Sequence, residues 1–331
     1  MFLLKIRHFA RKHDHFNCRN IFLCYNNYIM KKAILIALVA VMIAVMGVSF
    51  TACNNATTQG QLQNILNDHN HESFEYAVSA QDKDGNPVAG YDGSYTVTLD
   101  KYTQGSTVTD FGSATLSDVK EGILVKGHLS VGTTEYFTGS YFSIINGSSY
   151  MVPAYSFRTI KKDGNVTFSL NAAYDGKKFN YTRTVDGKES SGTVDLGKVV
   201  NYYDNNEFHQ ALRTITTFSE SLAFSFSMPI VSATEASSVS ITARVLGKVN
   251  VKNAFTDSRA DLQDGGIACY KTAISRATEV AGISQTLFYA VGDVAMSGWN
   301  MKHILVRIQE PFKADGNTYS MVYDLKTAEL H

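Results

Sequence analysis

The clearest structural pattern in the chain lies in residues 165–196, which read NVTFSLNAAYDGKKFNYTRTVDGKESSGTVDL. Apolar and polar residues alternate over 166–170 and again over 179–185, and an Asp-Gly pair follows each run, at 175–176 and 186–187. A period of two places successive side chains on opposite faces of a strand. Asp-Gly accepts the positive φ angles of a tight hairpin turn. The segment therefore predicts a three-stranded antiparallel meander.

The same two signals recur along most of the chain. Further Asp-Gly pairs stand at 84–85, 92–93, 163–164, 264–265 and 315–316. Strand-like runs cover 95–99, 123–131, 137–145, 150–160, 224–231, 304–308 and 319–325, the last two as a closing hairpin. The chain has only four prolines, so ladders can run without interruption. We therefore predict a β-rich α+β fold: an antiparallel meander sheet, curved or half-barrel-like, with one or two helices packed on it.

Two segments have a helical period instead. Asp204 and Glu207 have the spacing of a capping box, and apolar residues follow at helical spacing as far as Phe218. A second helix is predicted from Ile267 to Ala281, where a glycine follows.

Composition limits the classes of protein to which the chain can belong. Its 331 residues are 44% hydrophobic and 11% aromatic, enough for a folded core. From Cys53 onward it carries 23 basic and 29 acidic residues, a net charge near −6. Nucleic-acid binding requires clustered Lys and Arg, so we expect no such partner. We predict one β-rich body over 74–331; a boundary near 232–238, giving two lobes, is the alternative.

Residues 30–53 have the order of parts of a bacterial export signal. Two lysines precede an apolar run over 33–46, small residues follow, and the sequence becomes polar directly after Cys53. The tetrapeptide Phe50-Thr51-Ala52-Cys53 resembles the lipobox of bacterial lipoproteins, although that family prefers Leu where Phe50 stands. The resemblance implies that the Cys53 thiol receives diacylglycerol and that a peptidase cuts just before it. The lipid chains then anchor the exported part to a membrane.

This prediction assigns 30–52 to the signal peptide and 53–73 to a polar, lipid-anchored tether. An uncleaved transmembrane helix is the alternative, because the apolar run is almost long enough to span a bilayer. Either arrangement places the body in the cell envelope, and Asn54 implies the outer membrane if the host has two membranes. Residues 1–29 precede a complete signal peptide, so we expect a mis-assigned upstream extension; a long charged n-region is the alternative.

Few residues indicate catalysis or a metal site. The chain lacks the Gly-x-Ser-x-Gly, His-Glu-x-x-His and phosphate-loop motifs, so we expect neither enzyme activity nor a cofactor. Residues 68–72 read DHNHE and could bind Zn²⁺ or Cu²⁺ loosely, but we favour a solvated stretch of tether and predict no metal site. With Cys53 acylated, Cys269 is left, and we expect it to be a small buried hydrophobe rather than a reactive thiol.

Aromatic residues are in surplus between 136 and 157. Adjacent aromatic pairs there point to opposite faces of a strand, so both faces must be covered or one must line a cavity. Tyrosine has an apolar ring and a polar tip, which suits contact with sugars or amphiphilic lipids. Our candidate ligand-binding residues are Tyr136, Tyr141, Phe142, Tyr150 and Tyr155. The predicted function is non-catalytic binding of an apolar or amphiphilic molecule or a glycan; an envelope protein–protein interaction module is the alternative.

Overall fold

The computed structural model describes most of the chain after residue 68. The described residues are 66, 69–144, 151–197, 202–204, 208–213, 223–252, 266–276, 284–292, 294–296, 299–301, 303–314 and 316–330. The chain divides into two compact units, Met1–Ala44 with Phe312–Thr318, and Val45–Pro311 with Tyr319–His331. The account below concerns the second. None of the helices within the described residues combines the length and the apolar character needed to cross a membrane.

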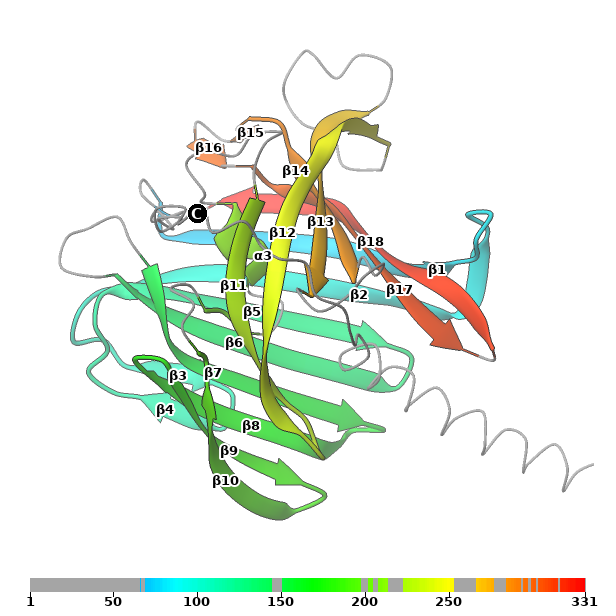
Figure 1. Ribbon diagram of the computed structural model, residues 1–331. Helices are drawn as coiled ribbons and strands as arrows, with labels where there is room; N and C mark the ends of the chain where they lie inside the picture. The colour runs from blue at the N-terminus through cyan, green and yellow to red at the C-terminus, as the bar shows by residue number, and fades with distance from the viewer. Residues whose placement is uncertain are drawn as a thin grey trace, which may run out of the picture. The chain divides into compact units, whose positions relative to one another are not determined.

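The structure consists almost entirely of strands (Figure 1). They are β1 (His71–Gln81), β2 (Pro87–Tyr102), β3 (Val108–Phe111), β4 (Ala114–Leu116), β5 (Gly122–Val131), β6 (Thr134–Ile144), β7 (Met151–Lys162), β8 (Asn165–Asp175), β9 (Lys178–Val185), β10 (Lys188–Asp195), β11 (Ala223–Val231), β12 (Ala236–Val251), β13 (Ile267–Arg276), β14 (Gln285–Ala290), β15 (Val294–Met296), β16 (Trp299–Met301), β17 (Leu305–Ala314) and β18 (Asn317–Leu330). Helix α3 covers Phe208–Leu212.

Fourteen of the described strands form one sheet, in the order β10-β9-β8-β7-β6-β5-β2-β1-β18-β17-β14-β13-β12-β11. Each neighbouring pair whose register the described residues define is antiparallel. Strands β5 to β10 form one meander, and the β1–β2 hairpin joins it to the C-terminal strands by pairing with both β5 and β18. The predicted antiparallel, curved sheet is confirmed.

The predicted meander over 165–196 is confirmed as strands β8, β9 and β10. The turn between β9 and β10 has φ angles of 47° at Asp186 and 78° at Gly187, both in the left-handed region that a two-residue hairpin turn requires. The pair at 92–93 is different, because it lies inside β2 rather than at a turn.

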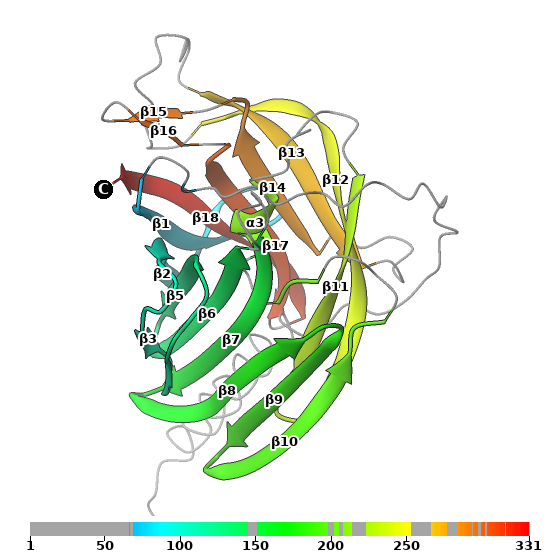
Figure 2. The same ribbon diagram turned by 90° about the vertical axis from the view of Figure 1, so that its left-hand side faces the viewer.

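The sheet curls until its two edge strands approach each other. Figure 2 shows β5 to β10 as one wall and β11 to β14 as the facing wall, with β10 and β11 close together. Two serine side chains of β11 and β12 donate hydrogen bonds to backbone carbonyls at the end of β10. Ser238 Oγ donates to the Asp195 carbonyl at 2.8 Å, and Ser227 Oγ donates to the Leu196 carbonyl at 2.7 Å. Val231 packs in the same buried cluster as Phe168. The result is a nearly closed, barrel-like sheet, in which the chain at Asp195 and Leu196, at the end of β10, is bonded to β11 and β12.

Helix α3 lies between the two walls, with all five of its residues buried (Figure 2). The first helical prediction is therefore confirmed over 208–212; residues 205–207 and 214–218 lie outside the described residues. Inside the sheet, the Phe208 ring lies 5.3 Å from that of Phe226, which lies 5.4 Å from Tyr203.

The second predicted helix is wrong. Ile267–Arg276 is strand β13, which pairs with β12 on one side and β14 on the other. Its short apolar run fits a helical period as well as a strand buried on both faces, and pairing with two neighbours decides between them. Cys269 lies in this strand and is buried, as predicted.

Candidate functional site

A buried ion pair fixes the C-terminal end of helix α3 to the sheet. Arg213 Nη1 donates to Glu72 Oε2 at 2.8 Å, and both side chains are fully buried. The guanidinium also lies 4.9 Å from the centre of the Phe74 ring. Burial alone would raise the pKa of Glu72, but the Arg213 charge and the hydrogen bond with His69 hold it below its usual value.

This ion pair corrects the prediction that a solvated tether extends to residue 73. His69 Nε2 lies 3.1 Å from Glu72 Oε1 in the buried region, and His71 Nδ1 lies 2.7 Å from Asp100 Oδ1. Glu72 is part of β1, and its side chain is needed to neutralise Arg213 inside the sheet. Within the residues that the structure describes, no group of three or more His, Cys, Asp or Glu side chains is placed to hold a metal ion.

A second polar network connects α3 to the C-terminal strands. His209 Nε2 lies 2.8 Å from Gln285 Oε1, and Gln285 Nε2 donates to Glu310 Oε2 at 2.9 Å. The Tyr323 hydroxyl donates to Glu310 Oε1 at 2.5 Å. Burial lowers the pKa of His209 to about 4 and raises that of Glu310. The imidazole is therefore held in its neutral form at neutral pH.

A third group of buried polar side chains fixes the segment at Asp204 to strands β6 and β7. Ser140 Oγ donates to Asp204 Oδ1 at 2.8 Å, and Ser156 Oγ donates to Oδ2. Burial raises the pKa of Asp204 although both hydroxyls favour its charged form. In its described residues, the interior of the sheet is thus packed with a helix, aromatic rings and paired polar groups.

The predicted aromatic ligand residues separate onto the two faces of the sheet, as alternation requires. Tyr136 and Phe142 are buried on the inner face, the side on which α3 lies. Tyr141 is buried on the outer face and donates its hydroxyl to the Lys120 carbonyl at 2.6 Å. Tyr155 is 37% exposed, whereas Tyr150 lies outside the described residues. Their part in ligand binding stays a prediction.

The β3–β4 hairpin covers part of the outer face. Phe111 of this hairpin packs edge-on against Phe157, with 4.9 Å between ring centres. Phe157 can lie across β6 because its partner there is Gly139, at which a Cβ would come within 2.1 Å of the ring. The hairpin is also bonded to β8, since Asn171 Nδ2 donates to Ser113 Oγ at 2.9 Å.

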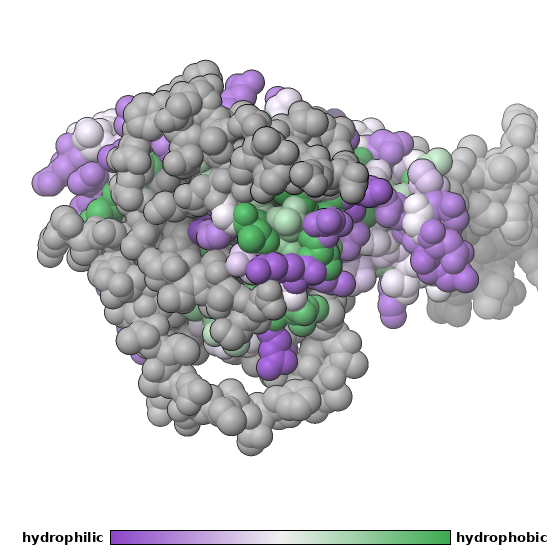
Figure 3. Space-filling view, turned by 90° about the horizontal axis from the view of Figure 1, so that it is seen from above, coloured by the Kyte–Doolittle hydropathy of each residue, from purple (hydrophilic) through white to green (hydrophobic). Residues whose placement is uncertain are grey.

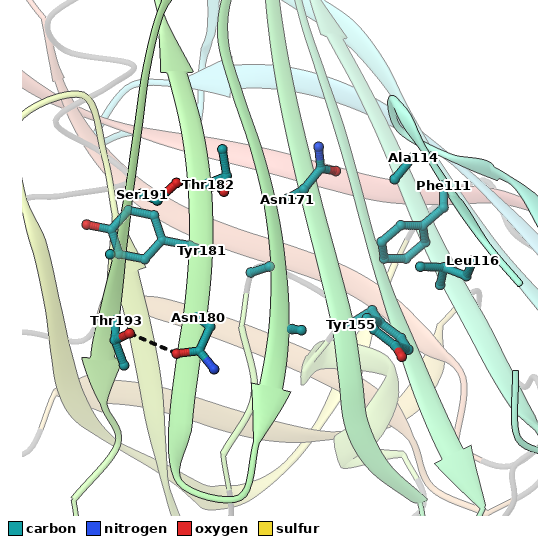
Figure 4. A pocket seen from close by; sticks show the side chains of 13 residues that line it. Phe111, Ala114, Leu116, Tyr155, Asn171, Asn180, Tyr181, Thr182, Ser191 and Thr193 are labelled. Atoms are coloured by element: carbon teal, nitrogen blue, oxygen red, sulfur yellow. Dashed lines mark hydrogen bonds between the residues drawn. The ribbon is translucent and has the colours of Figure 1, made fainter.

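An open groove of about 650 Å³ runs beside this hairpin over β7 to β10 (Figure 4). The side chains that Figure 4 labels around it are Phe111, Ala114, Leu116, Tyr155, Asn171, Asn180, Tyr181, Thr182, Ser191 and Thr193. No charged residue lines the groove among those that the structure describes there. Its surface combines one exposed tyrosine with neutral amides and hydroxyls.

The polar groups of the groove are held in place by one another. Thr193 Oγ1 donates to Asn180 Oδ1 at 2.8 Å, and the Thr182 and Ser191 hydroxyls lie 2.9 Å apart. The Asn180 Oδ1 bond orients the amide so that its Nδ2 group is available as a donor. An arrangement of this kind can bind a neutral polar molecule through hydrogen bonds while an aromatic ring covers its apolar face.

The sequence analysis selected Tyr155 but missed the amides and hydroxyls. The signal was present, because neutral polar residues recur at alternate positions of the 165–196 meander: Thr167, Ser169, Asn171, Asn180, Thr182, Ser191 and Thr193. Such alternation is also typical of any solvated sheet face, so only the hairpin beside it distinguishes a groove.

The end of the molecule seen from above differs from the uncharged groove in its surface composition. There, hydrophobic side chains gather among hydrophilic ones (Figure 3). The exposed large hydrophobic residues among those described are spread over several strands: Tyr155, Val166, Leu246 and Val249. Only Tyr155 of these four borders the groove.

Comparisons with known proteins give little further information. No model of a known protein family matches the chain, and a search of the curated proteins finds no match either. Among solved structures, the chain is similar to a beta-barrel-like protein of a domain of unknown function, DUF1849, from Brucella abortus. The two are 10% identical, with a TM-score of 0.45 over 80% of this chain and 98% of that one.

Two further solved structures have much lower scores. The enduracididine biosynthesis enzyme MppR, complexed with the condensation product of pyruvate and imidazole 4-carboxaldehyde, is 8% identical, with a TM-score of 0.15 over 87% of this chain and 97% of that one. Immune modulator A of Aeromonas veronii is 10% identical, with a TM-score of 0.14 over 80% of this chain and 97% of that one. Likenesses of this size establish neither the fold nor the function of the chain.

Proposed function

We propose that this protein is a glycan-binding lipoprotein of the cell envelope, held at the membrane by lipid on Cys53. The observation that carries the proposal is the uncharged groove on the outer face, with Tyr155 at its edge and the amides and hydroxyls of β8 to β10 on its floor. Sugars offer both an apolar ring face and a rim of hydroxyls, which are the two chemistries that this surface can satisfy.

The interior makes a glycan a better candidate than a lipid. A lipid carrier needs an apolar cavity, whereas the described interior holds a buried ion pair, Glu72–Arg213, and a helix between the walls. Emptying that space would leave charged groups without partners, at a cost of several kcal/mol. The outer groove needs no such rearrangement, because it is already open to solvent.

The size of a short saccharide sets an upper limit on its affinity for the groove. A disaccharide has about two dozen non-hydrogen atoms, and ligands of moderate size gain about 0.3 kcal/mol per atom at best. The binding free energy is then no better than about −7 kcal/mol, or a Kd of about 10 µM. We therefore expect Kd values between about 10 µM and 1 mM for short oligosaccharides.

A glycan array followed by titration calorimetry tests the proposal. Tyr155→Ala should weaken binding of the best oligosaccharide by about 2 kcal/mol, or roughly 30-fold, because an aromatic anchor is lost. Leu246→Ala is the control, since it removes another exposed apolar side chain, 50% exposed against 37% for Tyr155, from β12. No binding to any glycan, or an equal loss in both variants, would contradict the proposal.

The membrane anchor is a separate part of the proposal and has its own support. The lysines, the apolar run and the Phe50-Thr51-Ala52-Cys53 tetrapeptide stand in the order of a lipoprotein signal. Two or more lipid chains hold a protein stably at a bilayer. The body could then present the groove to envelope or environmental polysaccharides.

A further inference from the structure

A second groove lies on the outer face, over β2, β5, β6 and β7, and its character is different. Its volume is about 560 Å³, and it also borders the β3–β4 hairpin, at Asp110, Gly112 and Ser113. Lys126 and Lys161 line it, together with His128. The first groove has no charged residue among those described, so the charge on this part of the face is concentrated in the second one.

Lys161 is held by an aromatic ring rather than by an acid. Its ammonium lies 4.7 Å from the centre of the Phe137 ring, and His128 stacks on Phe137 at 4.3 Å with an interplanar angle of 8°. Within the described part of the chain, Lys161 has no carboxylate at ion-pair distance. A cation–π contact leaves the three N–H groups of an ammonium able to donate to a further acceptor.

The acidic groups near this site are weak competitors for a ligand. Asp110 contacts Lys126, but its side chain is 74% exposed, and a surface pair of this kind contributes little to stability. Glu135 is engaged by His128, with 3.1 Å between Oε1 and Nε2. An incoming anion can therefore displace the Asp110 carboxylate from Lys126 at small cost.

Hydroxyl groups complete the site. Thr96, Thr98 and Thr159 stand at outward positions of β2 and β7 in this groove. Thr98 Oγ1 is buried, and no hydrogen-bond partner for it exists among the described residues. A buried hydroxyl without a partner is uncommon in folded proteins, and this one can hydrogen-bond to a water or to a ligand in the groove.

The two grooves meet at one hydrogen bond. Ser113 lines the second groove, and it accepts from Asn171, which lines the first. We propose that the second groove binds the carboxylate or sulfate group of an acidic glycan whose neutral sugars occupy the first groove. This inference rests on the proposed function, because it assigns the substrate class of the same outer face.

Matched acidic and neutral saccharides test it. Hexagalacturonate and its methyl ester share the same sugars and differ at the carboxyl groups, as do sialylated lactosamine and its methyl ester, and each can be titrated into the full-length protein. We expect the acidic member of a bound pair to bind about tenfold more tightly at 50 mM salt, as one charged hydrogen bond gives. The advantage should shrink at 500 mM salt.

Lys161→Gln should abolish the preference and leave the affinity for the neutral member unchanged. Lys188→Gln, which removes the same charge from an exposed site on β10, should keep the preference. Equal affinity for both members, or a preference that survives in Lys161→Gln, would overturn the inference while the proposed function stands. Sulfate alone competing as well as the acidic saccharide would also overturn it, because the site would then be an isolated anion site.

The two proposals fail in different ways. Binding of the acidic member that depends on Lys161 but not on Tyr155 would support the anion site and contradict the first groove. Absence of binding by every member would overturn both.

Discussion

His209 should make the free energy of unfolding depend on pH by an amount that can be calculated. Burial lowers its pKa from 6.5 to about 4 in the folded state. The unfolded chain therefore takes up a proton on this side chain between pH 6.5 and 4, whereas the folded protein does not. Folding stability must fall as pH falls through that window. The pKa difference corresponds to a loss of about 2 kcal/mol between pH 7 and pH 5, and of about 3 kcal/mol once pH is below 4.

Urea unfolding at pH 7, 6 and 5 measures this effect by comparison with His209→Gln. Glutamine can still donate to the Gln285 side chain, which accepts from His209 at 2.8 Å in one tautomer, but it does not titrate. All other groups are shared, so their contributions cancel in the difference. The wild-type protein should lose about 2 kcal/mol more than His209→Gln between pH 7 and pH 5.

A control on the same helix excludes a general effect of loosening α3. Ala211→Gly also changes a buried residue of this helix and should cost about 1 kcal/mol at every pH, giving a curve parallel to the wild type. Identical pH dependence in wild type and His209→Gln would refute the reasoning, because the imidazole would then be free to take up a proton in the folded state.

Three further changes test other parts of the account. Arg213→Met should destabilise the protein by about 3–5 kcal/mol in urea unfolding, because Glu72 is left buried without its partner. The double variant with Glu72→Leu should recover most of this loss. A single variant as stable as the wild type would contradict the buried ion pair. Gly139→Ala should lower the free energy of unfolding by about 1–3 kcal/mol in the same assay, because the added Cβ would lie 2.1 Å from the Phe157 ring. An unchanged unfolding midpoint would show that the Phe157 ring does not lie against Gly139. Cys53→Ala should remove both labelled palmitate and membrane association in cells; retention of both would contradict lipidation.

The parts of the fold that could be predicted are those fixed by neighbouring residues. Alternation and Asp-Gly turns act within a few residues, so the meander over 165–196 follows from the sequence directly. The sequence over 267–276 has no such turn between its apolar residues, and its period suits both a helix and a strand. Pairing with β12 and β14, which the local sequence does not encode, makes it a strand.

The interior depends on contacts that no local pattern contains. Glu72 and Arg213 are 141 positions apart in the sequence, and each by itself looks like a solvated charge. Likewise, Asn180 and Thr182 have the pattern of any solvent-facing strand. They become part of a groove only because the β3–β4 hairpin packs on Phe157, beside them. Tyr155 could be selected because aromatic residues are in surplus over 136–157, but its exposure follows only from the structure.

A crystal structure of the protein with the oligosaccharide that binds most tightly in the array is the most direct test of the outer-face site. The account predicts density for a sugar ring against Tyr155, with hydroxyls within hydrogen-bond distance of Asn180 and of the Thr182–Ser191 pair. Density for the saccharide between the walls around α3, or anywhere else away from the β3–β4 hairpin, would contradict it.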